Sequence, residues 1–211
     1  GGPARDYLAG RGLDADTINR FRLGFAPDGR GTLKTELMGG TISEAQLIEA
    51  GMLIAPDDGG ASYDRFRGRI MFPITDRRGR PIAFGARALG DGQPKYLNTP
   101  DTPLFNKGHI LYGLATARRA AHDTGRLLVC EGYMDVIALA QHGIPYAVAT
   151  LGTSTSETHL ERLFRIVPEI VFCFDGDDAG RKAAFRGLEA TLPAMQDGLQ
   201  AKFLFLPEGE D

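Results

Sequence analysis

Hydrophobic and polar positions follow different periods in the two halves of the chain. Residues 3–55 contain short helical patterns such as DADTINRF and TISEAQLIEAGML, the second with a capping box that starts at Ser43. Residues 69–98 change to strand-like alternation, with RRGR between RIMFPITD and PIAFGARAL. This change predicts a β-hairpin that has Gly79 in its turn and Pro81 at the start of its second strand. KYLNTP predicts a further short strand.

From about residue 115 onward, short apolar runs alternate with helical patterns. RLLVC, YAVAT, EIVFCF and AKFLFL are predicted to be strands, and the second helix between them has a capping box expected at Ser154 and Glu157. Strands that are apolar on both faces and joined by helices indicate a parallel sheet. The fold class is therefore α/β: a mixed α+β subdomain over residues 1–122, then a Rossmann-like parallel sheet flanked by helices over residues 123–211.

Acidic residues follow three of the predicted strands. Glu131 comes directly after RLLVC, Asp175 comes directly after EIVFCF, and the acids that end at Asp211 follow AKFLFLP. The carboxyl ends of parallel strands lie at one edge of a sheet, where ligands bind. Carboxylates gathered there repel one another unless cations neutralise them. Oxygen ligands without His or Cys favour Mg²⁺ or Mn²⁺.

Three other interpretations of DGDDAG compete with a catalytic metal site. A calcium loop that starts at Asp175 needs an oxygen ligand at its fifth position and Glu at its twelfth, but Ala179 and Arg186 occupy these positions. A phosphatase of the haloacid dehalogenase type also has a strand followed by Asp-x-Asp, but it leaves EGYMD unexplained. A plain acidic surface turn explains one acidic cluster and not three at strand ends.

Charge is distributed unevenly along the chain, although its net value is only −3. Residues 1–120 carry 17 Lys and Arg against 13 Asp and Glu, whereas residues 121–211 carry 7 against 14. A basic half beside an acidic half suits a protein that binds a polyanion with one and cations with the other, although such asymmetry also arises by chance.

The two cysteines and the lack of long apolar runs indicate in which cellular compartment the protein is expected. Cys130 and Cys173 have no CxxC spacing, so a structural zinc site is not expected, and both fit as core thiols in a reducing cytoplasm. No apolar run approaches the ~20 residues that span a membrane.

Two motifs carry a resemblance to a known family. EGYMD at 131–135, followed 44 residues after its Glu by DGDDAG, resembles the toprim domain that primases, topoisomerases and some nucleases share. RFRGRIMFPITDRRGRPIAFGAR, PKYLNTPDTPLFNKGHILYGL and AVATLGTS resemble the catalytic core of bacterial replicative DNA primases. The resemblance covers essentially the whole chain.

The resemblance implies a site that holds two or more Mg²⁺ or Mn²⁺ ions and no zinc. Its ligands are Glu131, Asp175, Asp177 and Asp211, with Glu131 as general base an open alternative. Asp135 lies one helical turn past Glu131 and either orients the site or serves the helix N-terminus. In the family the motif continues past PEGED to PD, so the toprim domain is expected to be truncated here and the chain to be a piece of a longer protein. The family's zinc-binding module and helicase-binding region are expected to be absent from it.

The basic half is expected to contact nucleic acid or nucleotide. Arg65, Arg67 and Arg69 would share one strand face, whereas Arg77, Arg78 and Arg80 are interpreted as residues of a solvated turn. Arginine forks suit phosphates, and a tyrosine can stack on an unpaired base. The predicted contacts are Arg65, Arg67, Arg87, Lys95, Tyr96, Asn98 and Lys107.

The resemblance further implies synthesis of short RNA primers from ribonucleoside triphosphates on single-stranded DNA by two-metal nucleotidyl transfer. The alternatives are another toprim enzyme, as a topoisomerase or nuclease fragment, or a noncatalytic module that binds nucleic acid. Expected partners are the template, the nucleotides and an RNA–DNA hybrid, with the replicative helicase and single-strand-binding protein contacting regions outside this chain. A cytoplasmic monomer at the bacterial replication fork is expected, with no membrane contact.

Overall fold

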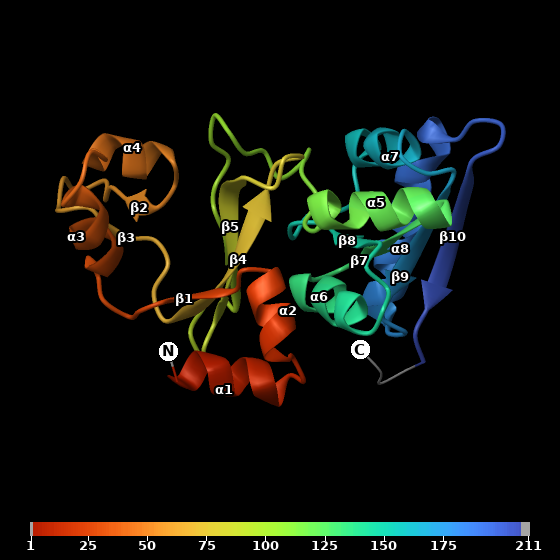
Figure 1. The fold of residues 1–211 in the computed structure, drawn as a ribbon. Coiled ribbons are helices and arrows are strands. Elements are labelled where there is room, and N and C mark those ends of the chain that lie inside the picture. Colours follow the sequence, from red (N-terminus) through yellow and green to blue (C-terminus); the bar gives the residue numbers. More distant parts are fainter. Residues whose placement is uncertain (1, 208–211) are drawn as a thin grey trace. The chain divides into compact units, whose positions relative to one another are not determined.

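The computed structural model describes residues 2–207, and its contacts divide them into two compact units (Figure 1). The first unit contains residues up to 74 and residues 80–106, and the second contains residues 75–79 and 107 onward. The predicted division between residues 122 and 123 falls inside helix α5 (Leu114–Thr124) of the second unit.

Side-chain caps set the starts of two helices in the first unit. The Asp14 carboxylate accepts a hydrogen bond of 2.7 Å from the Thr17 backbone. Ser43 and Gln46 form the predicted capping box, which is therefore confirmed. The helices of this unit are α1 (Gly2–Gly10), α2 (Ala15–Arg20), α3 (Thr32–Met38) and α4 (Glu44–Glu49).

A four-stranded sheet in the order β1-β4-β5-β6 forms the rest of the first unit, beside a two-stranded pair, β2-β3. Gly79 has a φ of 76° in the turn after β4 and Pro81 begins β5, so the predicted hairpin is confirmed. Ile70, Phe72 and Ile74 alternate along β4 and are fully buried. The strands are β1 (Gly24–Ala26), β2 (Leu53–Ile54), β3 (Tyr63–Asp64), β4 (Arg69–Thr75), β5 (Pro81–Ala88) and β6 (Tyr96–Asn98).

The expectation that Arg65, Arg67 and Arg69 share one strand face is wrong. β3 ends at Asp64 and β4 begins at Arg69, and the residues between them are not in a strand. Alternation of side chains along a face requires continuous extended backbone. The three arginines therefore have separate environments.

The second unit contains the predicted parallel sheet, in the order β10-β9-β7-β8, with helices on both faces (Figure 1). The predicted α/β class is confirmed. The strands are β7 (Arg126–Cys130), β8 (Ala147–Ala149), β9 (Glu169–Phe174) and β10 (Gln200–Phe205). The helices after α5 are α6 (Tyr133–Gln141), α7 (Glu157–Phe164) and α8 (Asp178–Thr191), followed by the short 3₁₀ turn η1 (Leu192–Ala194).

Strand order decides which helix covers which face. The chain steps one way from β7 to β8 and the other way from β8 to β9 and on to β10, so right-handed crossovers place α6 opposite α7 and α8. Ala117 of α5, Leu160 of α7 and Ala184 of α8 share one buried cluster with inward side chains of the strands. No helix in residues 2–207 is both long enough and apolar enough to cross a membrane.

The start of α7 differs from the prediction by two residues. Its cap is Ser156, whose Oγ accepts from the His159 backbone at 3.2 Å while His159 Nδ1 accepts from the Ser156 backbone. The predicted capping box at Ser154 and Glu157 is therefore wrong, since Glu157 is already the first residue of the helix. In STSETH, the serines at 154 and 156 both fit the N-cap position, and the usual capping-box partner is Glu or Gln, not the His159 found here.

Candidate active site

The sheet edge brings Glu131 and Asp175 together. β7 and β9 are adjacent parallel strands, paired Val129 with Phe172, and each acid follows directly after its strand. A backbone hydrogen bond from Asp175 reaches the Glu131 carboxylate. The predicted meeting of these two strand ends is therefore present in the structure.

Glu131 lies in a negative environment. Partial burial of its carboxylate raises its pKa, and the charges of Asp175, Asp135 and Asp177 raise it further, against the lowering effect of the Asp175 backbone hydrogen bond. The residue as a whole is nevertheless exposed, so the carboxylate stays accessible. Such a group favours a bound cation, because a positive charge would reverse the unfavourable interactions.

Two further predicted acids cap the helices that follow the strands. Asp135 accepts a hydrogen bond of 2.8 Å from the Gly132 backbone at the start of α6. Asp177 is the N-cap of α8, and its Oδ1 accepts from the Gly180 backbone at 2.7 Å. Asp178 is the first residue of α8. Each capping carboxylate is thus oriented beside the strand ends by its own helix.

Gly180 lets the first turn of α8 lie directly on the end of β9. A Cβ at this position would come within 2.1 Å of the Asp175 carbonyl oxygen, which only glycine avoids. The close approach keeps Asp177 beside Asp175. The group that requires glycine at position 180 is therefore backbone of the same chain.

A hollow of about 280 Å³ opens at the ends of β7, β8 and β9. Glu131 lies on one side of it, the 150–155 segment after β8 contributes hydroxyl groups, and Arg186 reaches it from α8. Sequence reasoning missed Arg186 as a member of this site. Its position about two helical turns after Asp178 was the available signal, because α8 begins at the sheet edge with that residue.

Within residues 2–207, no group of three His, Cys, Asp or Glu side chains is placed to hold a metal ion. The predicted ligand Asp211 and the other acids of PEGED lie outside the described residues. Of the predicted ligands, the structure thus describes Glu131, Asp175 and Asp177. Their oxygens suit a hard divalent cation.

The two cysteine side chains lie against each other beneath the acids. Cys130 is buried and Cys173 is half-buried, and neither forms a disulfide. The hydrogen bond with Cys173 and burial raise the pKa of the Cys130 thiol. Both residues serve as small core side chains near the carboxyl ends of β7 and β9.

Among the predicted nucleic-acid contacts, Arg87 and Tyr96 lie opposite each other on β5 and β6. The Arg87 guanidinium lies 4.5 Å from the Tyr7 ring centroid and 5.9 Å from that of Tyr96. Tyr96 is 45% exposed and Lys95 beside it is exposed, on a strand that forms one edge of the sheet. The arrangement offers cationic and aromatic groups along one edge.

The remaining predicted contacts are more dispersed. Arg67 donates to the Asp64 carbonyl and lies 5.0 Å from the Tyr63 ring, while burial lowers the pKa of Arg65. Asn98 is half-buried on β6, and Lys107 is exposed in the second unit. Arg69 is only 6% exposed and donates to the Pro94 carbonyl, so its contacts are internal.

The second unit therefore belongs to the α/β domains that carry their site at the carboxyl edge of a parallel sheet. A family model described as "DNA primase catalytic core, N-terminal domain" matches residues 1–118, and one described as "Toprim-like" matches residues 128–211. The chain belongs to the DNA primase family and corresponds to its catalytic core. The resemblance on which the sequence analysis rests is confirmed.

Individual relatives agree with this placement. DNA primase of Pseudomonas putida is 60% identical over 208 residues, which is 99% of this chain and 32% of that protein. The Escherichia coli primase catalytic core has a TM-score of 0.92 at 54% identity, covering 100% of this chain and 67% of that one. A DnaG primase catalytic domain bound to single-stranded DNA has a TM-score of 0.90 at 54% identity, covering 99% and 67%. The chain spans about a third of the length of the curated relatives that it matches.

Proposed function

We propose that this chain synthesises short RNA primers from ribonucleoside triphosphates on a single-stranded DNA template. The observation that carries the proposal is the pairing of Glu131 with Asp175 at the sheet edge, in a chain that matches primase catalytic cores over nearly its whole length. A similar catalytic domain was solved with single-stranded DNA, and another with double-stranded DNA.

The chemistry joins a ribose hydroxyl to the α-phosphate of a nucleotide and releases pyrophosphate. Glu131, Asp175 and Asp177, together with Asp211, would hold two or more Mg²⁺ or Mn²⁺ ions; domains of the toprim type use divalent ions in general. When bound, such ions lower the pKa of the attacking hydroxyl and neutralise charge on the departing pyrophosphate.

The protein's own groups would set the geometry. Asp135 and Asp177 keep fixed orientations because each caps a helix, and Arg186 would meet negative charge in the strand-end hollow. Lys95, Tyr96 and Asn98, with Arg87 behind Tyr96, would contact template phosphates and bases from the edge of the first sheet. Arg65, Arg67 and Lys107 complete the proposed nucleic-acid or nucleotide contacts.

The same proposal includes the wider setting. The product would be held as an RNA–DNA hybrid in the bacterial cytoplasm by a monomeric core. The replicative helicase and single-strand-binding protein would contact regions outside these 211 residues.

Templated incorporation of labelled ribonucleotides tests the proposal. We expect incorporation with Mg²⁺ or Mn²⁺ and a loss of about 100-fold or more in Asp175→Asn, because the neutral amide is a weaker metal ligand. Asp197→Asn, at an exposed acid of the second unit that lines none of these hollows, is the matched control and should keep full activity. A chain that incorporates nothing on any single-stranded template contradicts the proposal, and DNA relaxation or cleavage in place of incorporation would assign it to another toprim class.

A further inference from the structure

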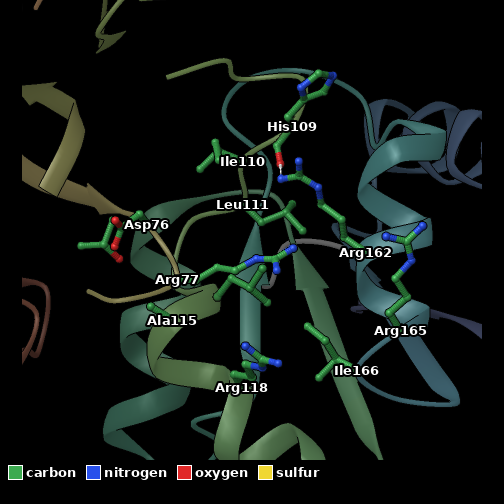
Figure 2. A pocket seen from close by; sticks show the side chains of 12 residues that line it. Asp76, Arg77, His109, Ile110, Leu111, Ala115, Arg118, Arg162, Arg165 and Ile166 are labelled. Carbon is green, nitrogen blue, oxygen red and sulfur yellow. Dashed lines mark hydrogen bonds between the residues drawn. The ribbon is translucent and has the colours of Figure 1, made fainter. Parts of the chain in front are cut away.

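A second hollow, of about 170 Å³, lies in the second unit between α5, the 109–111 segment before it, the 75–77 turn and the end of α7 (Figure 2). It shares no lining residue with the strand-end hollow. Leu111, Leu114 and Ile166 contribute apolar surface to it. Its charged lining residues are Asp76, Arg77, Arg118, Arg162 and Arg165, with His109 beside them.

The arginine charges at this hollow are poorly compensated. Among the described residues, the side chains of Arg77 and Arg118 form no hydrogen bond or ion pair. Arg162 donates to the backbone carbonyl oxygen of His109, which is a neutral acceptor and does not compensate the guanidinium charge. Arg165 has an acid, Glu161, only at 3.8 Å, in an exposed pair that contributes little.

The nearest acid of the lining does not neutralise the arginines. The Asp76 carboxylate accepts a hydrogen bond of 2.8 Å from the Arg78 backbone within the hairpin turn. In Figure 2 it points away from the hollow, whereas the Arg77 side chain extends across it. Arg77, interpreted from sequence as a solvated turn residue, therefore faces a hollow of the second unit.

The basic surface continues beyond this hollow. An adjoining depression shares Ala115, Arg118, Arg165 and Ile166 with it and adds Arg119, His122 and one acid, Asp123. The two together follow α5 from Leu114 to Asp123, which is roughly 14 Å at ~1.5 Å per helical residue. The shape is elongated, with cations repeated along it.

We propose that this arginine groove, formed by Arg77, Arg118, Arg119, Arg162 and Arg165, binds the phosphate backbone of single-stranded nucleic acid. Guanidinium forks match phosphate oxygens, and a groove of this length is long enough to contact more than one phosphate of a strand. Cations repeated along the groove should bind a polymer with repeated negative charges better than a compact nucleotide or a peptide with one acidic end. The groove is separate from the proposed catalytic carboxylates and adds a second place where a strand is held.

Fluorescence anisotropy of a labelled oligothymidylate, with EDTA and no nucleotide, tests the groove. We expect the double variant R118Q/R165Q to bind about 10-fold more weakly and to reduce the slope of log K against log salt by about 1.4, at ~0.7 per lost phosphate contact. The matched control R11Q/R78Q removes the same charge from exposed arginines that do not line the groove and should change both quantities much less.

Equal effects of the two double variants would overturn the proposal, since only general charge would then matter. The Nε–Hε NMR signals of Arg118 and Arg165 give a second measurement. They should shift with the oligonucleotide, and shifts produced only by ATP or only by an acidic peptide would instead assign the groove to those ligands and overturn it. Binding without nucleotide or metal is measured apart from incorporation, so this proposal and the proposed function fail independently.

Discussion

His159 shows how much the environment of one residue changes its chemistry. It is completely buried at the start of α7, and its Nδ1 accepts a hydrogen bond from the Ser156 backbone, which requires that nitrogen to be unprotonated. Burial, and then the positive charge of Arg162, lower the pKa of His159 from 6.5 to about 4. The folded chain therefore contains a neutral histidine where the unfolded chain takes up a proton.

This shift predicts a pH-dependent loss of stability. Between pH 6.5 and about 4 the unfolded state binds a proton that the folded state does not, so the free energy of unfolding falls as pH falls, by up to about 3 kcal/mol. Urea denaturation at a series of pH values should show a smaller fall in His159→Gln, which keeps an acceptor for the cap. His122→Gln, at an exposed position, should show the same fall in the free energy of unfolding as the parent chain. An equal fall with pH in all three proteins would contradict the role of His159.

At the scale of elements, local signals locate most segments, but they misplace the start of α7 and the strand expected to include Arg65 and Arg67. The hairpin was predictable because RRGR contains the glycine that its turn requires, and α4 because Ser43 and Gln46 satisfy each other within one turn. At α7 the local pattern offered two serines. Ser156 is the cap, and its Oγ also donates to the Gly108 carbonyl, 48 residues away, a contact that no local pattern contains.

The start of α8 provides a matched pair of glycine substitutions. Gly180→Ala should lower stability by about 1–3 kcal/mol, because the new Cβ would lie 2.1 Å from the rigid Asp175 carbonyl. Gly187→Ala, in the same helix, meets only Phe174 at 3.5 Å and Phe203 at 3.7 Å and should be neutral or more stable by up to about 1 kcal/mol. Chemical denaturation of both variants measures the difference, and equal destabilisation would show that the close approach at Gly180 is not required.

At the scale of the whole molecule, the strand-end carboxylates should link stability to divalent metal. Millimolar Mg²⁺ or Mn²⁺ should raise Tm by a few degrees, because the ions bind the folded state and relieve the repulsion that raises the pKa of Glu131. Asp175→Asn should have the higher Tm without metal and lose most of the metal response. Thermal melts at matched ionic strength measure this, and an unchanged Tm in the parent chain would contradict metal binding by these acids.

The sequence by itself determined the class of the fold and the identity of the residues at the sheet edge. Continuous apolar runs predict strands buried on both faces, and strands joined by helices run parallel, so whatever follows each strand must arrive at the same edge. Glu131 and Asp175 were predictable for that reason. The motifs around them also identified the family, because their spacing is specific.

Only the tertiary structure decided which segments distant in sequence meet. The strand order β10-β9-β7-β8 decides that α5 and α7 cover one face, and this brings Arg118 close to Arg165 although 46 residues separate them. Arg77 joins them from the hairpin turn. Periods of 2 and 3.6 report which face of an element is apolar, but they carry no information about which element will cover it, since that depends on packing of the whole core.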